Sequence, residues 1–167
     1  MTISMHQACV PVLTQALNTM AAILDKAAAH CAAKKIDPSV LINFRLTPDM
    51  LPFKSQIYIM TDQAKGCAAR LAGVDVPSYP DTEATFEDLK ARLKKTADFV
   101  QSFKPNQIDG SEDKDIVLKF GPNEFKFKGQ GYLLNFVIPN VFFHESMAYA
   151  ILRHCGVEIG KRDFLGG

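Results

Sequence analysis

The stretch HESMAYAILRHCGVEIGKRDFLG, residues 144–166, says most about the fold of this chain. Its first half is apolar at helical spacing, and Gly156 follows where a left-handed glycine commonly ends a helix. Its second half mixes charged side chains with Phe164 and Leu165. These features predict a helix that ends at about Cys155, followed by a short tail.

Working outward, we expect this last helix to begin at about Gly131. Pro139 should bend the helix or mark where it properly begins, because proline lacks the backbone N–H that a helix needs. The segment is apolar nearly all round, and such helices lie in the interior of a protein. We therefore predict that it is the most buried helix.

Three earlier segments place apolar residues three or four positions apart, which is typical of helices with one buried face. They cover residues 4–34, 52–71 and 86–103. Pro11 predicts a kink or a late start in the first segment, and Gly73 supplies a stop for the second. Thr85 and Asp88 resemble a capping box at the start of the third.

Between the third and last helices the spacing changes to strict alternation. Ile116 and Leu118 precede a Gly-Pro-Asn turn at residues 121–123, and Phe125 and Phe127 follow it. This pattern predicts a β-hairpin. The connections are too long for tight helical hairpins, so we predict one all-α domain over residues 1–167, a four-helix bundle with long crossover connections and the hairpin before its last helix.

Composition restricts the setting of this domain. With 47% hydrophobic and 22% charged residues in 167, the chain can bury one core, and a net charge of +1 favours neither nucleic acid nor an anionic membrane as partner. Residues 1–7 lack the basic start of a secretory signal, and polar residues interrupt the apolar stretch 132–151, so we expect a cytoplasmic protein without a membrane span. Four scattered cysteines fit reduced, mostly buried thiols.

Several strings carry a family resemblance, namely Phe142-Phe143-His144, the run from Ala148 to His154, and GKRDFLG at residues 160–166. Together with the helix order they resemble the DinB/YfiT-like four-helix-bundle family, in a branch described as a domain of unknown function. The resemblance covers essentially the whole chain. It implies a bundle that often forms homodimers, in some members binds a divalent metal through three histidines, and in some transfers a low-molecular-weight thiol.

The metal pattern of that wider family has one histidine on the second helix and an H-x-x-x-H pair on the last. Here the pair begins at His144, but Ala148 stands four residues later, and residues 52–71 contain no histidine. One of three ligands carries over, whereas zinc or nickel needs about three protein donors. We therefore expect no metal or other cofactor; a divalent metal would have to recruit Glu145, His6 or a thiol beside His144.

His144 shares a helical stripe with apolar residues, which allows two interpretations. It is either a core histidine bonded to a neighbouring helix, or a ligand or proton-transfer group in a pocket that also includes Tyr149 and Arg153. The tail is equally open. Phe164 and Leu165 either plug the end of the bundle, which we favour, or close over the pocket, or meet a partner subunit.

No sequence motif compels an enzymatic function. The chain lacks a G-x-S-x-G serine, a glycine-rich phosphate loop and an acidic pair with distinctive spacing. Three classes remain. We favour a bundle that binds a small molecule or a second copy of itself; the alternatives are a metal-dependent enzyme of the thiol-transferase or hydrolase type with altered ligands, and a structural scaffold.

Overall fold

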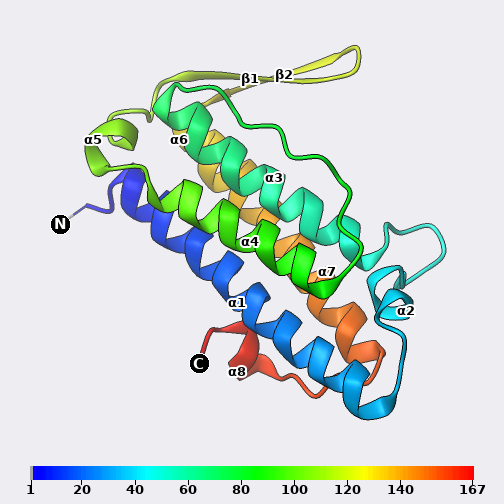
Figure 1. Cartoon of the computed structure of the whole chain (residues 1–167). Helices are drawn as coiled ribbons and strands as arrows, with labels where there is room; N and C mark the ends of the chain where they lie inside the picture. The colour runs from blue at the N-terminus through cyan, green and yellow to red at the C-terminus, as the bar shows by residue number, and fades with distance from the viewer. Residues whose placement is uncertain (1) are drawn as a thin grey trace.

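Four long helices form the bundle that the sequence predicts (Figure 1). They are α1 (Met5–Lys34), α3 (Phe53–Ala72), α4 (Phe86–Gln101) and α7 (Ile138–His154). These bounds come from a computed structural model that describes residues 2–167. In Figure 1, α1 and α7 run in one direction, and α3 and α4 run in the other. The strongest packing is between α1 and α4 and between α3 and α7.

The connections explain this order. The short helix α2 (Pro38–Ile42) lies between α1 and α3 at one end of the bundle. The segment 73–85 then runs back along the length of α3, so that α4 starts at the same end as α3 (Figure 1). This is the long crossover that distinguishes the fold from an up-and-down bundle.

The predicted helix ends are confirmed. The Thr85 side chain accepts from the Asp88 backbone N–H, and Asp88 accepts in return from the Thr85 backbone, which completes the capping box of α4. Gly73 ends α3 with a left-handed φ of 78°. Pro11 lies inside α1, which starts at Met5. The predicted late start is therefore wrong, because the exposed ring fits on the outer side of a long, well-packed helix.

The hairpin follows the short helix α5 (Pro105–Ile108) and is formed by β1 (Asp115–Phe120) and β2 (Asn123–Lys128). The strands pair antiparallel, with Ile116 opposite Phe127 and Leu118 opposite Phe125. Ile116 and Leu118 are buried in the core. The predicted hairpin is confirmed, and beyond these two residues it extends away from the helices (Figure 1).

The predicted last helix divides into three parts. These are one turn, α6 (Gly129–Gly131), the π-helix η1 (Tyr132–Val137), and α7. The N–H of Ile138 donates to the carbonyl of Leu133, five residues earlier, and Pro139 follows with no N–H to offer. Pro139 therefore marks the start of the regular helix. Gly156, with φ 87°, ends it.

α7 is not the most buried helix, contrary to the sequence prediction. Thirteen of the twenty residues of α3 are buried, against five of the seventeen of α7. The reason is position, since α3 lies among the other helices, whereas α7 turns one apolar side outward. Phe143 on that side is 53% exposed.

α1 is long and apolar enough, by length and composition alone, to cross a membrane. In the bundle 56% of the residues in its most apolar window are buried. They include Leu13, Leu17 and Met20, which have no exposed surface. A core helix of a bundle passes the same length and composition test, so the packing explains its apolar character.

Candidate functional site

His144 bonds to the second long helix. Its Nδ1 atom lies 2.8 Å from Oε1 of Gln56 on α3, and the amide of Gln56 donates in turn to the carbonyl of Leu51 at 2.9 Å. Burial lowers the pKa of His144 below its usual 6.5. The geometry is that of a half-buried histidine that bonds to a neighbouring helix and also lines a shallow surface hollow.

This arrangement does not fit the metal site of the wider family. α3 meets His144 with an amide, Gln56, and Ala148 contributes no donor atom. Among the residues that the structure describes, no three or more His, Cys, Asp or Glu side chains come together as a metal-binding group. His6 lies near the start of α1, six residues or roughly 9 Å before Val12, the first α1 residue that lines a cavity together with Glu145.

Glu145, the next residue, is the most unusual polar side chain of α7. It is 1% exposed, and neither carboxylate oxygen has a hydrogen-bond partner among residues 2–167. Burial raises its pKa from 4.5 to about 8, because removing the carboxylate from water disfavours its charged form. At neutral pH the free protein therefore holds Glu145 mainly as the neutral acid. An unpartnered buried group of this kind needs an explanation, and a role in binding a ligand is one.

Glu145 lines a cavity of about 160 Å³ that we call the tail cavity. α1 and α7 form its walls, and the C-terminal tail covers it. Its other lining residues are Val12, Gln15, Ala16, Thr19, Phe142, Phe164 and Leu165. An apolar cavity of ~150 Å³ holds a molecule the size of benzene. The tail cavity therefore combines room for a small organic group with one recognition group.

The tail is fastened over this cavity by contacts from both walls. The short helix α8 (Lys161–Phe164) places Asp163 so that its Oδ1 accepts from Lys26 Nζ of α1 at 2.5 Å. Gln15 donates to the carbonyl of Leu165 at 3.2 Å, and the ring of Phe164 packs edge-on against Tyr149, with centroids 5.7 Å apart. Figure 1 shows α8 beside α1.

The tail therefore lies along the side of α1, and the favoured prediction that it plugs the end of the bundle is wrong. The alternative, closure over a pocket, describes the position of Phe164. Leu165 remains 57% exposed. Two predicted pocket residues support the path of the tail, since Tyr149 bonds the carbonyl of Ile159 at 3.5 Å and Arg153 that of Val157 at 3.1 Å.

A wider groove of about 880 Å³ runs along α1 next to the tail cavity. The two share Gln15 and Thr19, and His6 lines the groove toward the start of α1. The His6 ring nitrogen Nε2 lies 3.1 Å from the carbonyl of Phe103. Glu145 lines the smaller cavity and not the groove.

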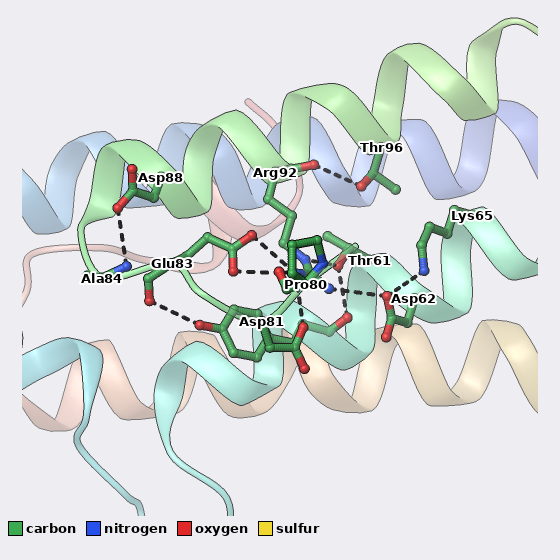
Figure 2. A network of polar contacts seen from close by, with 11 residues as sticks. Thr61, Asp62, Lys65, Pro80, Asp81, Glu83, Ala84, Asp88, Arg92 and Thr96 are labelled. Atoms are coloured by element: carbon green, nitrogen blue, oxygen red, sulfur yellow. Dashed lines mark hydrogen bonds and ion pairs between the residues drawn. The ribbon is translucent and has the colours of Figure 1, made fainter. Parts of the chain in front are cut away.

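A second polar cluster surrounds Arg92 of α4 (Figure 2). Its Nε donates to Thr61 at 2.8 Å, Nη1 pairs with Glu83 at 3.1 Å, and Nη2 pairs with Asp62 at 3.2 Å. Nη1 also pairs with Asp81 at 3.0 Å. The guanidinium, whose side chain is 2% exposed, thus joins α3, α4 and the crossover segment. These bonds hold α3, α4 and the crossover segment together, so we interpret the cluster as structural.

Sequence reasoning named Glu145 only as a metal candidate and missed Arg92. Both signals are present in the spacing. Glu145 interrupts the buried stripe of Val141, Ala148 and Leu152. Arg92 lies three residues after buried Leu89 on the inner face of α4. A charged residue at a position that helical periodicity assigns to the core is the feature that would have identified them.

The four thiols are all free. Cys9 and Cys67 face each other in the core with their Sγ atoms 3.9 Å apart. Burial raises the pKa of Cys67, which keeps it as the unreactive thiol. The predicted buried thiols are therefore confirmed for Cys9, Cys31 and Cys67, whereas Cys155 is partly exposed.

Comparison with known proteins agrees with this architecture. The chain is similar to the crystal structure of a DinB family member protein from Shewanella denitrificans, with 32% sequence identity, a TM-score of 0.87, and coverage of 97% of this chain and 92% of that one. This likeness defines the class as DinB-like helical bundles. The model of the family DUF1993, a domain of unknown function, matches residues 5–165, and the chain belongs to that family. Among proteins with curated descriptions, none matches.

Proposed function

We propose that this DUF1993 protein binds a small molecule in the tail cavity. The observation that carries the proposal is Glu145, which lines the cavity and whose two buried carboxyl oxygens have no partner among the described residues. A ligand able to bond this group would remove the cost of leaving a buried polar group unsatisfied. Apolar side chains around it would contact the rest of the ligand.

The enclosing walls suit a binding site of modest size. Ala16 and Thr19 are buried on α1, and Phe142 and Phe164 supply aromatic surface from α7 and the tail. Small-molecule sites are typically apolar pockets with few placed polar groups. The covering segment is fastened to α1 by the partly exposed Lys26–Asp163 pair and the bond from Gln15 to the carbonyl of Leu165, contacts that are each weak enough to open and reclose.

Ligand-observed NMR with a library of small amines, alcohols and acids tests the proposal. Val12→Phe, at a half-buried wall position, should fill the cavity and abolish binding. Ala29→Phe adds the same side chain at an exposed position of α1 outside the cavity lining and should leave binding unchanged. Binding that survives Val12→Phe would contradict the proposal.

Self-association is the second candidate, because α7 presents Phe143 on its outer side next to a shallow hollow lined by Phe136 and Pro139. A ring on one copy can fill the hollow of another in a symmetric dimer. Sedimentation analysis of Phe143→Ser against the wild type tests this. A dimer that dissociates in the variant supports the α7 face as the interface, and a wild-type monomer opposes self-association.

An altered metal enzyme is the remaining alternative. Its candidate ligands His144, Glu145 and His6 are directed to different places, namely to Gln56 of α3, to the tail cavity, and to the carbonyl of Phe103. Metal analysis of purified protein separates this alternative. Stoichiometric zinc, nickel or iron that is lost in His144→Ala would favour it.

A further inference from the structure

We infer that the ligand of the tail cavity is a small organic ammonium ion, held with its nitrogen against the carboxylate of Glu145. The inference rests on the proposed function and specifies the chemical class of the ligand. It specifies only the charged end of the ligand. The hydrocarbon part is limited by the size of the cavity, about 160 Å³.

The polar atoms at the cavity favour a donor-rich cation. Glu145 offers two oxygens without partners among residues 2–167. Gln15 uses its amide nitrogen on the carbonyl of Leu165, which leaves its amide oxygen as an acceptor, and Thr19 adds a hydroxyl. An ammonium group has three donors and no acceptor, and a charge-assisted bond to a carboxylate is about twice as strong as a neutral one.

The aromatic lining points to the same class. Phe142 and Phe164 both border the cavity, one from α7 and one from the tail. Ring faces attract cations, and the attraction increases when the cation is removed from water. An anionic ligand would meet no positively charged side chain among the lining residues, and the ionised carboxylate of Glu145 would repel it.

No built-in cation competes for Glu145 from the elements packed against it. Of the residues lining the cavity, Glu145 alone is titratable. Lys26 of α1 pairs with Asp163 of α8, and neighbouring His144 bonds Gln56 of α3. On α8, Lys161 and Arg162 have exposed side chains and do not line the cavity.

Proton release follows from this chemistry. Burial raises the pKa of Glu145 to about 8, so at pH 6.5 the free protein carries the neutral acid. An ammonium ion favours the carboxylate, and the proton leaves to the solvent as the ion pair forms. Below pH 8 the affinity should therefore rise about tenfold per pH unit and level off above it, with nearly one proton released per ligand at pH 6.5.

The probes are tert-butylammonium and its neutral isostere tert-butanol, with pivalate as the anion of similar shape. Calorimetry at pH 6.5, 7.5 and 8.5, in two buffers of different ionisation enthalpy, measures both affinity and proton release. We expect tert-butylammonium to bind at least tenfold more tightly than tert-butanol at pH 8.5. Glu145→Gln, which keeps the shape without the charge, should abolish both that preference and the proton release.

The outcomes separate the two proposals. Suppose that tert-butanol or pivalate binds as tightly as the ammonium ion, and that Val12→Phe abolishes this binding. The ammonium inference is then overturned, whereas the proposal that the cavity binds a small molecule stands. If none of the three binds to the wild type, or if binding ignores Val12→Phe, both are overturned. Selective, proton-releasing binding of tert-butylammonium supports both.

Discussion

The Nδ1 atom of His144 donates a hydrogen bond to Oε1 of Gln56 across 2.8 Å, because the amide nitrogen of Gln56 is engaged by the carbonyl of Leu51. The neutral ring therefore carries its proton on Nδ1, and burial lowers its pKa. Nitrogen-15 NMR should show this tautomer and a titration midpoint below 6.5. A proton on Nε2, or a midpoint above 6.5, would contradict the geometry.

Glu145 should make the stability of the protein depend on pH. Its pKa is raised from 4.5 to about 8 in the folded state, so the free energy of unfolding is largest, as far as this group is concerned, below pH 4.5. It should fall by on the order of 1.4 kcal/mol per pH unit between those values and level off above pH 8.

Chemical denaturation of Glu145→Gln tests this, because glutamine does not titrate. Relative to the wild type, the variant should become more stable as pH rises from 5 to 8. Glu158→Gln, at an exposed position, serves as the control and should run parallel to the wild type. If the dependence of stability on pH were the same for Glu145→Gln as for the wild type, the wild-type Glu145 carboxyl would not be a buried group without a partner.

Arg92 should be essential for stability. Arg92→Met would leave Glu83 and Asp62 without their buried cation and should destabilise the protein by on the order of 3 kcal/mol in urea titrations. Lys94→Met removes the exposed pair with Asp98 on the same helix and should cost no more than about 0.5 kcal/mol. Equal effects of the two substitutions would contradict the structural role given to the Arg92 cluster.

The Lys26 and Asp163 pair should restrain the tail. Asp163→Asn weakens both that pair and the bond from the backbone N–H of Gly160. Hydrogen exchange across residues 160–167 should then become faster, while exchange in α3 should not change. Asp98→Asn, which loses an exposed pair on α4, is the matched control. Unchanged exchange of the tail in Asp163→Asn would show that other contacts hold it.

Much of the fold follows from local signals in the sequence. The capping box of Thr85 and Asp88 and the stop at Gly73 are local chemistry and appear where predicted. The burial of α7 was misjudged because hydrophobicity shows that Phe143 is apolar, not whether another helix covers it. That depends on tertiary packing, in which the crossover segment 73–85 runs along α3 and adds to the burial of that helix.

The candidate site was harder to predict because it depends on contacts across long sequence separations. Periodicity placed His144 on an apolar stripe, but only the packing of α3 shows that Gln56 meets it. Likewise, nothing local to the tail indicates that Phe164 lies over the α1 residue Ala16 and next to Glu145. The sequence shows that Glu145 interrupts an apolar stripe of the last helix, but it does not show the cavity that this residue lines.

The crystal structure of the protein soaked with tert-butylammonium at pH 8.5 tests the central claim most directly. The account predicts the ligand in the tail cavity, with its nitrogen about 2.7–2.9 Å from a Glu145 carboxylate oxygen and its methyl groups against Phe142 and Phe164. A tail cavity without the ligand, or a ligand bound away from Glu145, would contradict it.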